Sequence, residues 1–408
     1  MVLVSLAAGC TTGSVPAGRP GLPAPSSREV ELRVGLTVGA GSANVGGNAA
    51  VSATQPDGSP IITIPGGEWW RVQVAGAGFV LVSPTGWTSP ELEALTLTPA
   101  ARTAAVWVNG KAYRGVAEVL RDRTGLTVVN RLGMELYLLG VVSAEMGRRR
   151  RNEQAALRAQ AVVSRTYALR NLRRWRGQGF DLYATVADQA YGGTAAETPE
   201  GREAVGATRG LILTHNGAPI EALYFSTCGG RTADGLEVFR SVARPYLKSV
   251  PDEAGNGSAY CSISPRFRWR EEWTGEALRA TLQRNLPEAG VLNEPVSMVR
   301  DIRVTKRTSS GRADQLTIGL GASVVRVEGT AIRRVLRPAS GELLRSNAFS
   351  LQVNGGGSSV TRVVADGAGA GHGVGLCQWG AVGRARAGQH VEQILAAYYP
   401  GTRLERRY

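Results

Sequence analysis

The stretch LLGVVSAEM, residues 138–146, is an apolar run that closes on a carboxylate, Glu145. Apolar surroundings disfavour the charged form of a carboxyl group and raise its pKa. A glutamate with a raised pKa can donate a proton near neutral pH, as a general acid does. The stretch therefore predicts a short helix that ends at a candidate catalytic group. The alternative is an ordinary surface glutamate at a helix end.

An alanine-rich stretch, EQAALRAQAVVSRTYAL at residues 153–169, follows closely. The chain from Glu153 to Trp175 contains no Gly or Pro, so no helix breaker interrupts it. Five of its residues fall on one face at helical spacing: Ala155, Ala159, Val162, Thr166 and Leu169. We expect one long helix here, beside the segment that carries Glu145.

The remaining pattern is mostly that of β-strands. Short β-branched or aromatic runs between Gly, Pro, Asn and Asp predict strands, and Asn-Gly pairs at 109–110 and 216–217 predict tight turns. The expected strands are 30–36, 61–64, 70–74, 79–82, 105–108, 126–130, 210–214, 222–226, 299–305, 314–319, 323–328 and 349–353. Strands 210–214 and 222–226 would form a hairpin, and 276–286 and 384–398 would be helices. The predicted fold class is α+β, strand-rich, with one long alanine-rich helix beside the catalytic segment and a C-terminal helix.

The N-terminus indicates export. Residues 2–10, VLVSLAAGC, are similar to the end of a bacterial lipoprotein signal, in which small residues precede a cysteine that becomes lipidated. We expect Cys10 to be that cysteine, with the protein anchored to a membrane in the bacterial cell envelope. The alternative is an ordinary apolar N-terminus with a chance cysteine. The next residues, through Ser27, have the composition of a flexible tether.

Three regions are expected along the chain. Residues 1–29 form the lipoprotein-type signal and tether, 30–104 a β-rich segment, and 105–408 the catalytic domain. The β-rich segment is either an integral part of the fold or a separate module.

The charge of the chain is strongly basic. Its 408 residues have a formal net charge of +14, and only three of the 47 basic residues are lysines. A basic surplus favours an anionic partner, such as nucleic acid, anionic lipid or an acidic cell-envelope polymer. No zinc-finger spacing, basic leucine-zipper pattern or RNA-binding signature is present, which argues against nucleic acid. The densest basic run, Arg148–Arg151, is expected to be a solvated loop.

Three cysteines follow Cys10 in the chain: Cys228, Cys261 and Cys377. In an exported protein two of them can pair, most plausibly Cys228 with Cys261, which leaves Cys377 free. A zinc site that combines these cysteines with His372 is an alternative, although no two ligands have the close Cys-x-x-Cys spacing. The connectivity cannot be deduced from the sequence alone.

Several motifs occur together in a characteristic order. They are VNGKAYRG (108–115), VN (129–130), YLLGVVSAEM (137–146), AQAVVSRTYA (159–168), YFSTCGGRT (224–232), PYL (245–247), GHGVGLCQWGA (371–381) and YYPGT (398–402). In order and spacing, residues 105–405 resemble the SpoIID/LytB family. That family includes SpoIID, a peptidoglycan lytic transglycosylase, and LytB, an amidase enhancer.

The resemblance implies cleavage of peptidoglycan glycan strands, with Glu145 as the catalytic acid and base. Such an enzyme protonates the glycosidic oxygen between MurNAc and GlcNAc. The same carboxylate then accepts the proton of the MurNAc 6-hydroxyl, which closes a 1,6-anhydro ring. This chemistry needs neither a second carboxylate nor a metal or cofactor. The family preference for glycan stripped of stem peptides implies an amidase as partner.

Other residues of these motifs are expected to contact the sugar. Arg165, with Tyr167 close by, would bind a lactyl carboxylate or hold Glu145; the alternative is a solvent-facing arginine or a structural ion pair. Ser226 and Thr227 would offer hydroxyls, although they can equally form a plain turn. The glycines around His372 allow close approach of the backbone. His372 and Gln378 would bond sugar hydroxyls and Trp379 would stack on a sugar, unless this motif is a packed structural turn.

The chain departs from the family pattern at three places. Gly147 and an arginine run stand where a proline and a Trp-Pro pair are usual, Cys377 replaces a serine, and Trp379 replaces a tyrosine. Cys377 with His372 raises a rival hypothesis of a cysteine hydrolase, although no nucleophile elbow surrounds it. A second rival is a non-catalytic wall-binding protein that activates an amidase.

Overall fold

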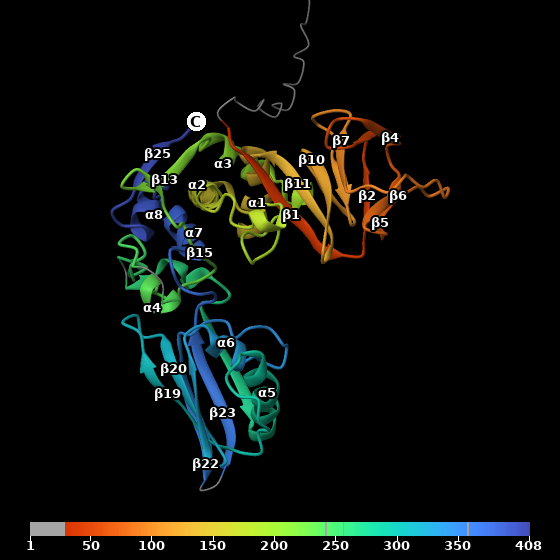
Figure 1. The fold of residues 1–408 in the computed structure, drawn as a ribbon. Coiled ribbons are helices and arrows are strands. Elements are labelled where there is room, and N and C mark those ends of the chain that lie inside the picture. Colours follow the sequence, from red (N-terminus) through yellow and green to blue (C-terminus); the bar gives the residue numbers. More distant parts are fainter. Residues whose placement is uncertain (1–28, 241–242, 256, 357–358) are drawn as a thin grey trace, which may run out of the picture.

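The N-terminal strands form two sheets that share one hydrophobic core (Figure 1). The computed structural model describes residues 29–240, 243–255, 257–356 and 359–408. The first sheet has the order β12 (Leu182–Tyr183), β1 (Glu31–Ala40), β11 (Gly125–Gly133), β10 (Val116–Asp122), β7 (Ala94–Pro99), β3 (Val51–Thr54) and β4 (Pro60–Ile64). The second has the order β6 (Gly78–Val82), β5 (Trp69–Ala75), β2 (Ser42–Gly47), β8 (Val106–Val108) and β9 (Lys111–Tyr113).

Strands from both sides of residue 104 pair with one another in these sheets. In the first sheet β1 pairs with β11, and β7 pairs with β10. In the second sheet β2 pairs with β8, and the Asn109-Gly110 turn after β8 has the left-handed φ angles of +47° and +81° that its sequence predicts. The β-rich segment 30–104 is therefore an integral part of the fold, the first of its two alternatives.

The central helix, α2 (Gln154–Arg170), is buried on nearly all sides rather than on one face. It contacts α1 (Met134–Met146), α3 (Pro199–Ala207), α7 (Gln378–Arg386), α8 (Val391–Tyr398) and β13 (Leu211–His215). Its many alanines let these neighbours approach closely. The helix ends at Arg170, before the expected Trp175, because Arg173 adopts a φ of +64° and its N–H bonds the Asp181 carboxylate at 2.8 Å. Among the described helices, none is long and apolar enough to span a bilayer.

The strands after α3 pair differently from the expected hairpin. β13 (Leu211–His215) turns at Asn216-Gly217, as predicted, but pairs with β14 (Ala218–Pro219) and with β25 (Arg403–Arg406). β15 (Tyr224–Phe225) instead pairs in parallel with β24 (Leu376–Cys377). The prediction of a 210–214/222–226 hairpin is therefore wrong. The actual pairing brings the YFSTCGG and GHGVGLCQ motifs side by side.

The C-terminal helix is divided into two. α7 ends at Arg386 and α8 begins at Val391, so the expected single helix over 384–398 is wrong. Gly388 in the connection has a φ of +82°, which no helix interior accepts. The shorter elements before the second lobe are α4 (Gly235–Phe239), β16 (Glu253–Ala254) and β17 (Ser258–Ala259).

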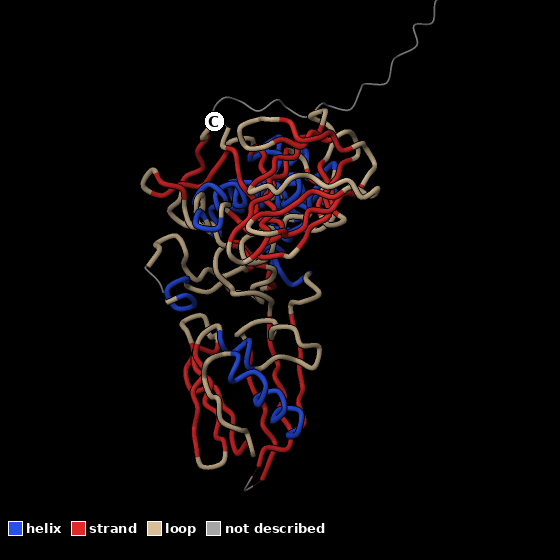
Figure 2. The backbone as a smooth tube through the Cα atoms, turned by 45° about the vertical axis from the view of Figure 1, so that its right-hand side comes forward, coloured by secondary structure: helices blue, strands red, loops and turns tan. Residues whose placement is uncertain are grey.

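A second lobe is inserted between β17 and β24 and has its own core (Figures 1 and 2). The chain enters through β18 (Arg268–Thr274) and returns through β23 (Ser359–Ala368), and these two strands pair in antiparallel fashion. β22 (Phe349–Gly356) completes that sheet, and a second sheet contains β19 (Val299–Arg307), β20 (Ala313–Leu320) and β21 (Ser323–Glu328). The lobe also contains α5 (Gly275–Glu288) and α6 (Ala331–Val335). Its two ends lie beside the cleft described next.

Candidate active site

A cleft of about 870 Å³ lies where the end of α1 meets β15 and the start of α7. Arg266 and Arg333 contribute to its wall from the side of the second lobe. Most of the predicted site residues line it: Glu145, Tyr167, Ser226, His372, Gln378 and Trp379. Arg165 and Thr227 do not. The cleft thus contains residues from motifs that are far apart in the chain, from 137–146 to 371–381.

Glu145 lies in the last turn of α1 and faces the cleft half-buried. Its Oε1 accepts the N–H of Ala190 at 2.7 Å and the hydroxyl of Tyr224 at 2.8 Å. Burial raises the pKa of the Glu145 carboxyl above its ordinary value, and the hydrogen bonds from Ala190, Tyr224 and Gln378 oppose that shift. The carboxyl is therefore held in one orientation and is easier to protonate than a surface glutamate.

The β15–β24 pairing places Tyr224 and Gln378 around this carboxyl. Tyr224 leads the YFSTCGG motif, and Gln378 follows the last residue of β24. Tyr224 also accepts a hydrogen bond from Gln189 at 3.2 Å, which keeps its hydroxyl hydrogen directed to Glu145. Sequence reasoning did not select Tyr224, although it begins a motif that was recognised.

His372 supports this arrangement from behind. Its Nε2–H donates to the carbonyl of Tyr224 at 2.9 Å, and its Nδ1 accepts the N–H of Val374 at 3.1 Å. Burial, together with the charges of Arg333 and Arg312, lowers the pKa of His372 to about 4. His372 is thus a neutral imidazole that fixes the backbone of Tyr224. Both ring nitrogens have protein partners, which favours the structural alternative for this motif.

Tyr167 is held in the cleft wall by Asp188. The Tyr167 hydroxyl donates to Asp188 Oδ1 at 2.9 Å, and Arg174 bonds both groups at 3.1 Å. Asp188 Oδ2 accepts bonds from the Trp175 indole and the Tyr183 N–H. The Asp188 carboxylate is therefore fully occupied as a structural anchor. Asp188 was not predicted, because it lies in a segment without a recognisable motif.

Several arginines line the cleft and give it positive charge. Arg149 stacks over the Trp379 ring, 4.5 Å from its centroid, so one member of the Arg148–Arg151 run lines the cleft instead of forming a solvated loop. Arg266 and Arg333 also line the cleft. Within the described ranges, none of these three arginines forms an ion pair with a carboxylate. Their positive charge is available to a ligand.

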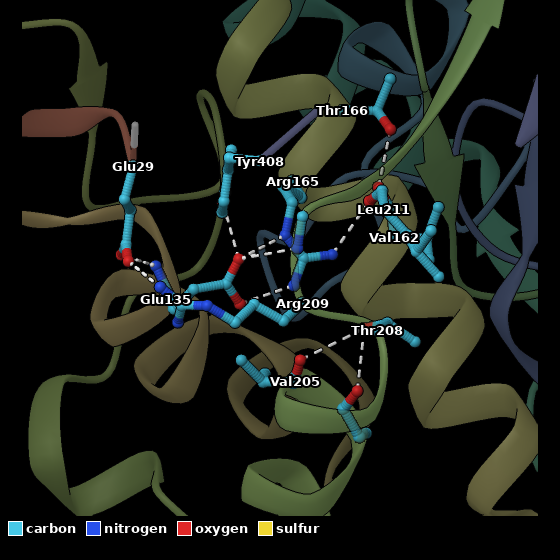
Figure 3. Close-up of polar contacts among 12 residues, drawn as sticks. Glu29, Glu135, Val162, Arg165, Thr166, Val205, Thr208, Arg209, Leu211 and Tyr408 are labelled. Carbon is cyan, nitrogen blue, oxygen red and sulfur yellow. Dashed lines mark hydrogen bonds and ion pairs between the residues drawn. The ribbon is translucent and has the colours of Figure 1, made fainter. Parts of the chain in front are cut away.

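Arg165 does not reach the cleft, which corrects its predicted role. Its side chain is fully buried and donates to both oxygens of Glu135, at 2.8 and 2.7 Å, and to the Leu211 carbonyl at 3.0 Å (Figure 3). Glu135 Oε1 also accepts the hydroxyl of Tyr408 at 2.6 Å and the N–H of Gly210 at 3.3 Å. Arg165 therefore forms a structural ion pair that joins α2, α1 and the C-terminus.

Ser226 and Thr227, the two hydroxyl residues after β15, lie in different environments. Ser226 lines the cleft, and its carbonyl accepts the N–H of Trp379 at 3.0 Å. Thr227 is buried and its Oγ1 lies 2.8 Å from the Ser264 hydroxyl, so the prediction that Thr227 contacts substrate is wrong. The two hydroxyls still contact each other, with their oxygens 3.2 Å apart.

The three cysteines gather behind the cleft wall, away from its surface. Cys228 and Cys261 are not bonded: their sulfurs are 3.3 Å apart, against about 2.05 Å in a disulfide. Cys377 is completely buried and does not line the cleft, which removes the basis for a cysteine hydrolase. His372, the fourth ligand considered for zinc, is occupied elsewhere. Cys10, the predicted lipidation site, lies outside the described residues.

Comparison with known proteins identifies relatives for both parts of the chain. The family model described as stage II sporulation protein, SpoIID, matches residues 122–215, and one for a domain of unknown function, DUF8618, matches residues 262–375. An uncharacterised protein of Brachyspira hyodysenteriae is 31% identical over 72% of this chain and 72% of its own length. Stage II sporulation protein D of Bacillus subtilis is 30% identical over 69% of this chain and 77% of its own length. The amidase enhancer of Bacillus subtilis is 27% identical over 61% of this chain and 38% of its own length.

Proposed function

The chain belongs to the SpoIID/LytB family, and on that premise we propose that it is a peptidoglycan lytic transglycosylase. It would cleave the MurNAc–GlcNAc bond of glycan strands in the cell wall and leave 1,6-anhydro-MurNAc ends. The observation that carries the proposal is the half-buried Glu145 carboxyl in an arginine-lined cleft, with a raised pKa and fixed hydrogen-bond partners.

Glu145 would act first as acid and then as base. Its proton passes to the glycosidic oxygen as that bond breaks, and GlcNAc leaves as the free alcohol. The Glu145 carboxylate then takes the proton of the MurNAc 6-hydroxyl, whose oxygen bonds to the anomeric carbon. No water is consumed, and Glu145 ends protonated as it began. The raised pKa favours the first step, and the bonds from Tyr224 and Ala190 stabilise the carboxylate in the second.

The other carboxylates of the cleft are engaged elsewhere, which favours a mechanism with one acid. Asp188 has four hydrogen bonds from protein donors, and Glu221 pairs with Arg244 at 3.2 Å. Ordinary glycosidases need a second carboxylate, either as nucleophile or to activate water. An intramolecular attack by the 6-hydroxyl needs none.

The cleft arginines support glycan stripped of stem peptides as the substrate. Removal of the stem peptide turns the lactyl group of MurNAc from an amide into a carboxylate. Arg149, Arg266 and Arg333 can pair with such carboxylates along a strand. An amidase that removes stem peptides would thus prepare the substrate, and is the proposed partner. We place the protein outside the cytoplasm, anchored through Cys10.

Mass spectrometry of the cleavage products tests the proposal. Purified glycan strands, with and without stem peptides, are incubated with wild type, Glu145→Gln and a matched control, Glu203→Gln. Glu203 is an exposed α3 residue that pairs with Arg158. We expect 1,6-anhydro ends from stripped strands, abolished by Glu145→Gln and retained in Glu203→Gln. Reducing ends in place of anhydro ends would indicate a hydrolase instead.

The second candidate function is that of a non-catalytic wall binder that enhances an amidase. The similarity to the amidase enhancer of Bacillus subtilis motivates it. It predicts that Glu145→Gln binds glycan and stimulates an amidase as well as wild type does, with no cleavage by either protein. Amidase stimulation measured on intact sacculi therefore separates the two functions.

A further inference from the structure

We propose that Cys228, Asp252, Cys261 and Cys377 form a buried structural Zn²⁺ site behind the wall of the cleft. One donor atom of each residue lies within 4.8 Å of the others, and all four residues are buried. They come from three separate parts of the chain: the turn after β15, the segment before the second lobe, and β24. Three thiolates and one carboxylate are a tetrahedral ligand set that suits Zn²⁺.

The spacing of the donors is close to that of a tetrahedral zinc shell. With Zn–S bonds of about 2.3 Å and Zn–O bonds of about 2.1 Å, sulfurs lie about 3.8 Å apart and sulfur–oxygen pairs about 3.6 Å apart. The Cys228 and Cys261 sulfurs are separated by 3.3 Å, and the Cys228 sulfur and Asp252 Oδ2 by 3.4 Å. These two separations are within about half an ångström of the tetrahedral values, and all four donors lie within 4.8 Å of one another, so shifts of up to about 1 Å would complete the shell.

Hydrogen bonds around the cluster orient its ligands. The sulfur of Cys377 accepts the N–H groups of Cys228 at 3.2 Å and Gly380 at 3.3 Å. Cys377 is also the N-cap of α7, where the positive end of the helix dipole favours a thiolate. The Tyr398 hydroxyl donates to Asp252 Oδ1 at 2.6 Å, which leaves Oδ2 directed to the cysteines. Such second-shell bonds are typical of metal ligands.

Two buried arginines balance the charge of the proposed site. Three thiolates, one carboxylate and Zn²⁺ have a net charge of −2. Arg384 Nε lies 3.5 Å from Asp252 Oδ1, and Arg312 donates to the carbonyl of Cys228 at 3.0 Å. Arg312 is 4% exposed and forms no ion pair with a carboxylate among the described residues. A buried charge needs a counter-charge, and an anionic zinc–thiolate centre provides one for Arg312.

A disulfide between Cys228 and Cys261 explains fewer features of this cluster than a zinc ion does. A Cys228–Cys261 bond would use two of the four donors, and would explain neither the position of Cys377 and Asp252 beside them nor the burial of Arg312 without a carboxylate partner among the described residues. The zinc ion would instead tie the turn after β15 to the start of α7. These elements carry Tyr224 and Gln378, which hold Glu145. The metal would therefore stabilise the catalytic wall without entering the cleft, and the inference does not depend on the proposed reaction.

Metal analysis of the full chain tests the site. The protein is purified from zinc-supplemented medium under reducing conditions, and its zinc is measured by plasma mass spectrometry and native mass spectrometry. We expect one Zn²⁺ per chain in wild type and in the control Cys10→Ser, and loss of zinc in Cys261→Ser and Cys377→Ser. A native mass without metal, or one lower by two hydrogens from a disulfide, would overturn the proposal.

Cobalt substitution keeps the test valid if the cysteine variants fail to fold. Zinc is removed from wild type with a chelator under reducing conditions, and Co²⁺ is added. Thiolate-to-cobalt charge transfer in the near ultraviolet, with the intense visible bands of tetrahedral Co²⁺, is the expected result. Only weak octahedral bands would contradict a cysteine-rich tetrahedral site.

Discussion

Replacing Arg165 by Met should lower the free energy of unfolding of the protein. We expect no direct effect on substrate binding, because Arg165 does not line the cleft. Arg165 makes three hydrogen bonds, two of them to the Glu135 carboxylate, and its side chain is fully buried. The substitution leaves that carboxylate buried with only the Tyr408 and Gly210 donors. Breaking a buried ion pair in this way costs about 3–5 kcal/mol. With an unfolding entropy of about 2.1 cal/mol/K per residue over the 408 residues of the chain, that lowers Tm by about 4–6 °C.

Urea denaturation followed by circular dichroism measures the free energy of unfolding of each variant. The double variant Arg165→Met/Glu135→Gln should recover more than half of the loss, because the amide carbonyl still accepts from Tyr408 and carries no charge. Arg158→Met is the matched control. Its exposed pair with Glu203 should contribute less than about 1 kcal/mol. If Arg165→Met unfolds with the same free energy as wild type but no longer cleaves glycan, this reasoning is wrong. Arg165 would then act on the substrate, as the sequence predicted.

Three further predictions concern the cleft and its support. Tyr224→Phe removes a bond that lowers the pKa of Glu145, so the alkaline limb of the pH–rate profile should move upward by about 1 pH unit. Arg149→Ala should raise KM for stripped glycan about 10-fold and weaken its salt dependence. His372 has a pKa of about 4 in the folded protein, below its ordinary value, so unfolded chains bind the proton first as pH falls. Wild type should therefore lose about 3 kcal/mol between pH 6.5 and pH 4, and His372→Gln should lose much less, as measured by urea denaturation at both pH values.

Each of these predictions has an outcome that would contradict it. An unmoved alkaline limb in Tyr224→Phe would mean that Glu145 is not the group that titrates. A KM for Arg149→Ala equal to that of wild type would place the glycan carboxylates elsewhere. Equal pH dependence of stability in wild type and His372→Gln would mean that the imidazole is protonated in the folded protein. Gly206→Ala, a change into open space on α3, should leave all three readouts unchanged.

Local patterns in the sequence predicted part of the secondary structure, whereas strands such as β2, β3, β7, β10 and β23 were not predicted. Alternating apolar residues marked β1, an aromatic and β-branched run marked β5, and the Asn-Gly pairs marked both tight turns, because these signals depend only on neighbouring residues. The apolar run before Glu145 correctly indicated a carboxyl whose pKa is raised by burial. The order of the motifs was enough to recognise the family, which the comparisons support.

Pairing between segments far apart in the chain determined the features that local patterns did not predict. The sequence placed strand 222–226 beside its neighbour in the chain, whereas β15 pairs with β24, about 150 residues away, and that pairing brings Tyr224 and Gln378 to Glu145. Periodicity showed one apolar face on α2, yet neighbours on all sides bury this helix and give Arg165 a partner on α1.

What the sequence by itself determined was therefore the local conformation and the identity of the chemical groups. Only the tertiary structure decided which groups meet. Asp252 joins three cysteines, and Arg149 leaves its basic run to line the cleft. Neither contact has a local signal, because the free energy that selects it comes from burial and charge compensation between segments far apart in the chain.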